Sequence, residues 1–209
     1  MTGISNNQDN VIFITGTSRG IEEGIARHYL KEGWTVVAAV RSPEAAPRLE
    51  GRIITVKADQ SSLTDFKDLK TKHNITHFDI VVASSGVAAS GAFLAQASPT
   101  EFDHIYKVNT RGPLVLYQAT RSLLKDDGTF VVILLASKAA VNYLTRTIHH
   151  EEPALKAFTI NPGAVDTKMI RDSLDAIGNP GAVENVVPGI VNVISTSTKE
   201  ENSGWMWNK

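Results

Sequence analysis

The chain has 209 residues, of which 42% are hydrophobic and 21% are charged, the proportions of one folded domain with a substantial core. Lys plus Arg number 21 against 22 Asp plus Glu, and this balance excludes binding dominated by nucleic-acid phosphates or by an anionic membrane surface. No cysteine is present, which excludes disulfides, thiol nucleophiles and thiolate metal sites.

Apolar runs with strand character alternate along the chain with segments of helical periodicity. Strands are predicted at residues 11–15, 35–40, 53–57, 78–83, 129–133 and 157–160, with a further short segment at 205–207. Helices are predicted at residues 21–31, 63–73, 99–124, 134–150 and 183–194. Continuous apolar strands joined by helices predict an α/β fold, a Rossmann-like doubly wound parallel sheet of about six or seven strands with helices on both faces.

A glycine motif stands between the first predicted strand and the first predicted helix. It reads Thr15-Gly16-Thr17-Ser18-Arg19-Gly20-Ile21, the context in which such a turn cradles phosphate groups at a helix N-terminus. Ligands of doubly wound sheets bind beyond the carboxyl ends of the strands. Further landmarks follow later strands or lie in later helices, namely Asp59, Ser84-Ser85-Gly86, Val108-Asn109, Ser137-Lys138 and Asn161-Pro162-Gly163.

These motifs, in this order, resemble the short-chain dehydrogenase/reductase family over roughly residues 10–205. Local stretches of the sequence are most similar to fungal polyketide ketoreductases. The resemblance implies hydride transfer between a nicotinamide dinucleotide and a carbonyl or alcohol, with Tyr, Lys, Ser and Asn as catalytic residues. It assigns catalytic roles to Lys138 and Asn109. It assigns cofactor contacts to Gly16, Ser18, Arg19, Gly20, Ile21, Arg41, Asp59, Ser84 and Gly86. The resemblance also places Ser85, Leu134, Asp166 and Lys168 as substrate-pocket candidates.

The chain departs from the family pattern where the catalytic tyrosine is expected. Four residues before Lys138 stands Leu134, whose alkyl side chain neither donates nor accepts a proton. The fifth predicted strand also runs directly into this segment, so the residues that carry the family's catalytic serine are missing. Loss of one proton-transfer group costs about 10²- to 10⁴-fold in rate, and we therefore expect a reaction other than ordinary carbonyl reduction.

A second departure concerns the phosphate-binding turn, where Glu22 stands at the last glycine of the family motif. A carboxylate there faces the phosphates as a like charge, so we expect weakened dinucleotide binding or no cofactor at all. Where a dinucleotide binds, Arg19 and Arg41 favour NADP, because two guanidiniums hold a 2′-phosphate and no acidic residue ends the second strand.

Each candidate also has a purely structural interpretation. Without the tyrosine, Lys138 is equally a partly buried helix lysine, whereas for Asn109 the favoured interpretation is a structural hydrogen bond to backbone across the sheet. Ser84 and Ser85 face a ligand or only cap their turn. His149-His150 and Glu151-Glu152 suggest a solvated helix end rather than a metal site, because adjacent helical side chains do not converge on one ion.

The sequence leaves three functions open. The favoured one is a non-redox isomerase, cyclase or dehydratase of a polyketide- or terpenoid-like metabolite. The alternatives are an NADP-dependent carbonyl reductase whose substitute proton donor is Tyr143, His104 or water, and a non-catalytic partner of a related enzyme. We expect one domain over residues 1–209 with a flexible stretch at 1–10, a small-molecule substrate, a homodimer or homotetramer, and a cytoplasmic location, with no nucleic-acid, membrane or metal partner.

Overall fold

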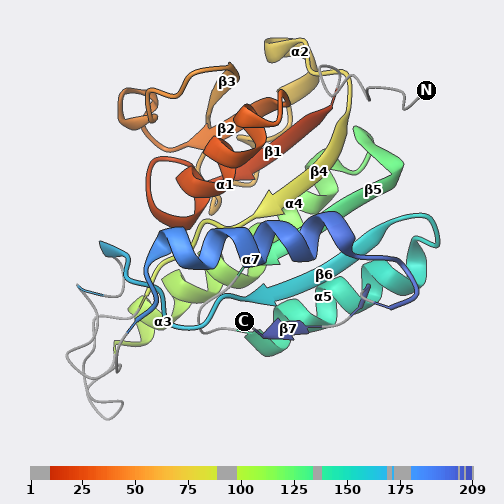
Figure 1. Cartoon of the computed structure of the whole chain (residues 1–209). Helices are drawn as coiled ribbons and strands as arrows, with labels where there is room; N and C mark the ends of the chain where they lie inside the picture. The colour runs from red at the N-terminus through yellow and green to blue at the C-terminus, as the bar shows by residue number, and fades with distance from the viewer. Residues whose placement is uncertain are drawn as a thin grey trace.

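The computed structural model describes residues 10–88, 98–133, 138–168, 171, 180–201, 203–204 and 206–208 (Figure 1). Its elements in chain order are β1 (Val11–Thr15), α1 (Gly20–Lys31), β2 (Thr35–Val40), the 3₁₀ turn η2 (Pro43–Ala45), β3 (Arg52–Lys57), α2 (Leu69–His73), β4 (Phe78–Ala83), α3 (Pro99–Tyr106), the π-helical segment η4 (Lys107–Arg111), α4 (Gly112–Thr120), β5 (Leu124–Ile133), α5 (Lys138–Glu151), β6 (Lys156–Asn161), α7 (Val183–Thr196) and β7 (Met206–Asn208).

The strands form one seven-stranded parallel sheet in the order β3-β2-β1-β4-β5-β6-β7. The chain builds outward from β1 to β3 and then returns to place β4 on the other side of β1. This reversal creates a crevice at the carboxyl ends of β1 and β4, where ligands of such sheets bind. The predicted Rossmann-like doubly wound fold is confirmed.

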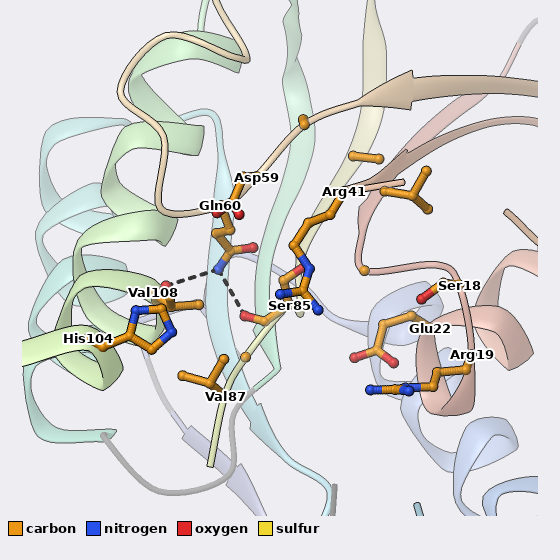
Figure 2. Close-up of a pocket in the computed structure, with 15 residues that line it drawn as sticks. Ser18, Arg19, Glu22, Arg41, Asp59, Gln60, Ser85, Val87, His104 and Val108 are labelled. Carbon is orange, nitrogen blue, oxygen red and sulfur yellow. Dashed lines mark hydrogen bonds between the residues drawn. The ribbon is translucent and has the colours of Figure 1, made fainter. Parts of the chain in front are cut away.

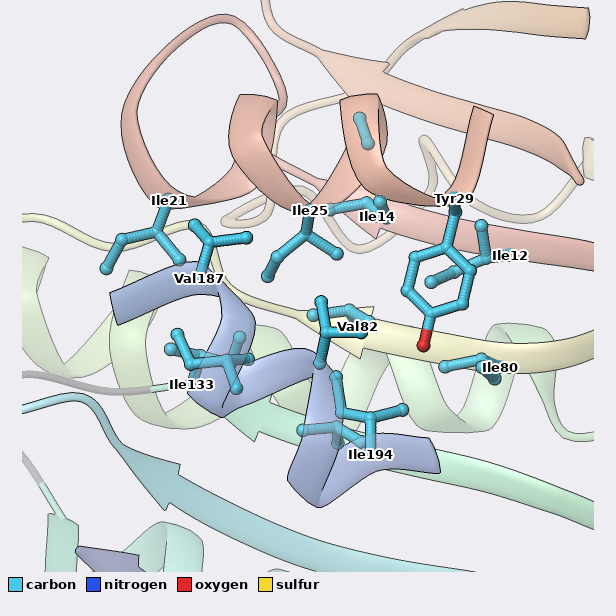
Figure 3. Packing of buried hydrophobic residues seen from close by; sticks show 14 of the residues in the cluster. Ile12, Ile14, Ile21, Ile25, Tyr29, Ile80, Val82, Ile133, Val187 and Ile194 are labelled. Atoms are coloured by element: carbon cyan, nitrogen blue, oxygen red, sulfur yellow. The ribbon is translucent and has the colours of Figure 1, made fainter. Parts of the chain in front are cut away.

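Both faces of the sheet are covered, which explains the unbroken apolar strands. In β1, Ile12 and Ile14 pack into the core on one face, whereas Phe13 packs into the core on the other. All three side chains are fully buried, because successive strand residues point to opposite faces. Helices α1 and α7 cover the first face, as Figure 3 shows for Ile25 and Val187, and helices α4 and α5 contribute residues to the second.

The predicted helix at 63–73 is wrong over its first part, since only Leu69–His73 is helical. The side chains of Ser62 and Asp65 bond backbone groups in the preceding turns. The backbone N–H groups of Thr64 and Asp65 donate to Ser62 Oγ, each at 3.2 Å, and Asp59 N–H donates to Asp65 Oδ2 at 2.9 Å. Such local bonds compete with helical ones and keep this part of the chain in turns.

The predicted continuous helix at 99–124 is also wrong in detail. It is interrupted by the π-helical η4 and ends at Thr120. Pro113 lies in the first turn of α4, and because proline has no N–H it cannot donate to the carbonyl four residues earlier, that of Asn109. The strand predicted from Thr129 begins at Leu124.

The helix predicted over 134–150 is described from Lys138 to Glu151, and its predicted first residues 134–137 lie outside the described residues. None of the helices in the described part of the chain is long and apolar enough to cross a membrane.

Candidate dinucleotide-binding site

A groove with about 750 Å³ of empty space lies at the carboxyl edge of the sheet, across the ends of β1, β2, β3 and β4 (Figure 2). Its lining includes seven of the residues that the sequence singled out: Gly16, Ser18, Arg19, Arg41, Asp59, Ser85 and Gly86. These residues come from four separate loops. The topology therefore brings six of the nine predicted cofactor residues to the groove, together with the substrate-pocket candidate Ser85, whereas Gly20 and Ile21 line an adjoining cavity.

The turn after β1 is shaped by two glycines in the left-handed region, Gly16 with φ +82° and Gly20 with φ +72°. A Cβ added to Gly16 would lie 2.7 Å from Ser85 Oγ, so a side chain there would collide with the loop after β4. Helix α1 begins at Gly20, and its N-cap residue Arg19 makes no capping hydrogen bond with its side chain. The first N–H groups of α1 thus receive no bond from the N-cap side chain, and the N–H of Glu22 donates to the carboxyl group of the same residue. The positive end of the helix suits an anion.

Thr15 joins the two loops that form the floor of the groove. Its hydroxyl oxygen accepts hydrogen bonds from the backbone N–H groups of Ser84, at 2.9 Å, and Ser85, at 3.0 Å. The side chain is buried at the end of β1. Sequence reasoning did not single out Thr15 as a functional residue, although a polar residue that closes an apolar strand is the signal that would have found it.

The far end of the groove carries Arg41, Asp59 and Gln60. Burial acts to raise the pKa of Asp59, but the hydrogen bonds from Ser61 and the positive charge of Arg41 outweigh it, so this pKa lies below its ordinary value. Asp59 is therefore an anion that faces Arg41 across the groove.

Gln60 is a groove residue that the sequence analysis missed. Its side-chain nitrogen donates to the backbone carbonyls of Ser85, at 3.0 Å, and Val108, at 3.4 Å (Figure 2). Its side-chain oxygen is buried and has no hydrogen-bond partner among the described residues. A buried acceptor of this kind needs a donor from a ligand or from water, and an amino group on a heterocyclic base supplies one.

Glu22 lies in the first turn of α1, and Ser84, one of the predicted cofactor contacts, follows β4. Ser84 Oγ donates to Glu22 Oε1 at 2.6 Å. Burial raises the pKa of Glu22 to about 7, against the lowering effects of the Ser84 hydrogen bond and of the Arg19 charge. The carboxyl group is thus divided between its neutral and ionised forms near neutral pH.

A second cavity, with about 770 Å³ of empty space, adjoins the same turn on the side of the loop after β6. Gly20 and Ile21 line it together with the substrate-pocket candidates Asp166 and Lys168. Asp166 Oδ1 pairs with Arg171 Nε at 3.3 Å. Arg19 and Glu22 line both the groove and this cavity, so the turn separates two adjoining spaces.

The two catalytic candidates differ in what the structure shows. Asn109 lies in η4 and is 5% exposed. Its side-chain oxygen accepts from Val87 N–H at 2.9 Å, and its nitrogen donates to Val87 O at 2.8 Å. Lys138 is the first residue of α5, and nothing about its side chain is described. Leu134 lies outside the described residues.

The residues of the groove fit a nicotinamide dinucleotide. The N-terminus of α1 suits a pyrophosphate, Arg19 and Arg41 suit a further phosphate, and the unpartnered oxygen of Gln60 suits the amino group of a base.

Two fungal relatives resemble most of the chain. It is 34% identical to the norsolorinic acid ketoreductase of Aspergillus parasiticus, covering 94% of this chain and 87% of that protein. It is 32% identical to the norsolorinic acid ketoreductase of Dothistroma septosporum, covering 91% and 86%. The first alignment spans 239 positions, more than the 209 residues of this chain, so the relative carries residues without a counterpart here.

Solved structures share the fold. A 3-ketoacyl-(acyl-carrier-protein) reductase from Brucella melitensis in complex with NADH superposes with a TM-score of 0.82 at 21% identity, over 95% of this chain and 96% of that one. A short-chain dehydrogenase from Burkholderia cenocepacia in complex with NADP gives 0.82 at 22% identity, over 98% and 97%. At these identities the likeness concerns the fold alone.

The prediction of a non-redox isomerase, cyclase or dehydratase is wrong. The relatives are named as ketoreductases, and the structural neighbours are reductases and dehydrogenases. The prediction took the leucine at position 134 as a sign that redox chemistry was lost. The dinucleotide groove, however, is built by the ends of β1 to β4, and an alteration between β5 and α5 leaves those elements in place.

The family comparison agrees with the fold and with the motifs. A profile described as short chain dehydrogenase matches residues 10–177, which contain the glycine turn, the groove and Asn109. This chain therefore belongs to the short-chain dehydrogenase family.

Proposed function

We propose that the protein is an NADP(H)-dependent carbonyl reductase that acts on a ketone of the polyketide class. The observation that carries this proposal is the groove in which the glycine turn, Arg41 and Asp59 meet. The names of the two fungal ketoreductases support the ketone substrate.

In this proposal the chain holds the dinucleotide by three features. The N–H groups at the start of α1 bind the pyrophosphate, Arg41 and Arg19 select a 2′-phosphate, and Gln60 accepts from the base. The bound dinucleotide supplies a hydride. The protein residues supply binding, orientation and exclusion of water.

The second cavity is the proposed place for the ketone. It adjoins the same turn, so a substrate there lies beside the dinucleotide groove. Lys168 gives the cavity a cation, while Ile21 and Val183 give it apolar walls. A metabolite that carries polar groups on an apolar ring system matches this combination of a cation and apolar walls.

The proton for the product oxygen is proposed to come from water. Tyr143 is 74% exposed on α5 and lines neither cavity. His104 lines the groove together with Asp59 and Gln60, at the end where the base is proposed to bind. Since Leu134 cannot donate, the reduction is expected to be slower by about 10²- to 10⁴-fold than with a positioned acid.

Calorimetric titration with NADPH tests this function, followed by measurement of NADPH consumption with aromatic polyketide ketones. Binding in the micromolar range and slow ketone-dependent consumption are the expected results. The double variant Arg19→Ala, Arg41→Ala is expected to lose binding, whereas Arg52→Ala, an exposed arginine on β3, keeps it. Absence of NADPH binding at millimolar concentration contradicts the proposal.

We further propose a homodimer in the cytoplasm. Of the five large apolar side chains exposed in the described part of the chain, four lie on α3, α4 and α5: Phe102 at 67%, Tyr106 at 53%, Leu114 at 39% and Tyr143 at 74% exposed. Apolar surface of this kind marks contact sites. Light scattering of the wild type and of Phe102→Glu tests the dimer, and a strict monomer in both contradicts it.

A further inference from the structure

Glu22 occupies a place in the phosphate-binding turn that suits an anion. It lies in the first turn of α1, where the helix N–H groups and the helix dipole attract negative charge. Glu22 Oε2 lies 3.5 Å from the position that a Cβ on Gly20 would take, so the carboxyl group folds back toward the turn. Figure 2 shows the carboxyl group beside the guanidinium of Arg19, at the border of the groove.

The carboxyl group is held there by Ser84. Their oxygens are 2.6 Å apart, and Ser84 itself is fixed to β1 because its backbone N–H donates to Thr15 Oγ1. None of the ion pairs among the described residues includes Glu22. The side chain is half-buried, and this burial raises its pKa to about 7.

Charged and titratable groups from five other segments face the two spaces that Glu22 lines. They are Arg19 before α1, Arg41 after β2, Asp59 after β3, His104 on α3, and Asp166, Lys168 and Arg171 after β6. The positive charge of Arg41 acts on Asp59 and lowers the pKa of that carboxyl group. Arg171 forms an ion pair with Asp166. Arg19 is the cation that acts on Glu22.

We propose that Glu22 couples binding of the dinucleotide to the uptake of one proton, so that the neutral side chain admits the anionic ligand and the ionised side chain opposes it. This inference rests on the proposed function. Protonation converts the carboxylate into a carboxyl group that donates a hydrogen bond, and no other bond is made or broken. The proton comes from solvent.

The direction of the effect follows from charge. Phosphate groups near Glu22 favour its neutral form and raise its pKa in the complex above the value in the free protein. Between these two pKa values binding takes up a proton, and affinity falls by up to about tenfold for each unit that the pH rises. Loss of the negative charge in Glu22→Gln removes this dependence.

The experiment is isothermal calorimetry with NADH and with NADPH at about pH 6 and about pH 8, in pairs of buffers that differ in ionisation enthalpy. NADH serves as the probe without a 2′-phosphate, because that phosphate titrates by itself near pH 6. The wild type, Glu22→Gln and Glu22→Gly are compared. Glu23→Gln, which removes the neighbouring carboxylate that pairs with Arg27 on α1 and does not line the groove, is the matched control.

The wild type and Glu23→Gln are expected to bind up to about tenfold more weakly at the higher pH and to take up a proton there. Glu22→Gln and Glu22→Gly are expected to bind with nearly equal affinity at both pH values, and more tightly than the wild type at the higher one. Equal pH dependence in the wild type and Glu22→Gln, with binding in both, overturns this inference alone. Absence of binding in the wild type and both Glu22 variants at both pH values overturns the proposed function as well.

Discussion

The side chain of Asn109 forms hydrogen bonds with both the backbone N–H and the backbone carbonyl of Val87. It accepts from Val87 N–H at 2.9 Å and donates to Val87 O at 2.8 Å, which fixes the loop after β4 against the π-helical turn η4. Gly86 is part of the same contact, since a Cβ there would lie 3.3 Å from Asn109 Oδ1. Asn109 thus supports the wall of the dinucleotide groove.

Asn109→Ala is expected to lower the free energy of unfolding by about 1–2 kcal/mol, because two part-buried backbone groups of Val87 lose their partner. Urea unfolding measures this effect. Asn192→Ala is the control, since Asn192 is exposed on α7, and it should leave stability nearly unchanged. Equal stability of Asn109→Ala and the wild type would show that water replaces the side chain.

Gly16→Ala is expected to weaken NADPH binding by about tenfold or more and to destabilise the fold by about 1–2 kcal/mol. The alanine would adopt a left-handed backbone, and its Cβ would meet Ser85 Oγ at 2.7 Å. Gly33→Ala is a matched control, because Gly33 has φ +83° and open space around its Cβ position. The control should lose stability and keep its affinity for NADPH, as measured by calorimetry.

Arg41→Ala is expected to reduce affinity for NADPH by about tenfold to a hundredfold, with little change for NADH, because it removes a cation from a 2′-phosphate. Calorimetry with both dinucleotides measures the ratio. Arg52→Ala, exposed on β3, should leave the ratio unchanged. Parallel losses for NADPH and NADH would assign Arg41 to the common part of the two molecules.

Leu134→Tyr is expected to raise the rate of ketone-dependent NADPH consumption by as much as about 10²-fold, because it restores a phenol four residues before Lys138. The gain is expected to be smaller than a full restoration, because the sequence also predicts the loss of the segment that carries the family's catalytic serine. Leu134→Phe provides the aromatic ring without the hydroxyl and should give no gain. Equal rates for the Tyr and Phe variants would exclude proton donation from this position.

Glu22 is expected to make the folded protein less stable as the pH rises. Its pKa is about 7 in the folded protein against an ordinary 4.5, so between these values the folded state holds a proton that the unfolded chain releases. The contribution of Glu22 to stability is therefore greatest below about pH 4.5 and falls by about 1–3 kcal/mol through the window up to about pH 7.

Thermal unfolding across this pH window measures the effect. The melting temperature of the wild type should fall relative to that of Glu22→Gln as the pH rises. Glu23→Gln is the neighbouring control, since Glu23 is paired with Arg27 on the outside of α1, and it should follow the wild type. Parallel curves for the wild type and Glu22→Gln would contradict the raised pKa.

The sequence by itself determined the sheet and the position of its ligand edge. The strand predicted at 35–40 is β2 without change, and the glycine turn after β1 opens α1 as expected. These features depend on local physical chemistry. A strand whose two faces are both covered by helices is apolar at every position. A tight turn into a helix requires a backbone conformation that only glycine adopts readily.

Only the tertiary structure decided which side chains complete the site. Gln60 reaches the groove because Val108 and Ser85 accept its nitrogen, contacts between residues far apart in the chain. The same is true of Glu22, whose carboxyl group bonds Ser84, although the sequence suggested only a charge aimed at phosphates. Hydrogen bonds across 25 or more residues leave no periodic pattern in a sequence, because they depend on how strands are ordered in space.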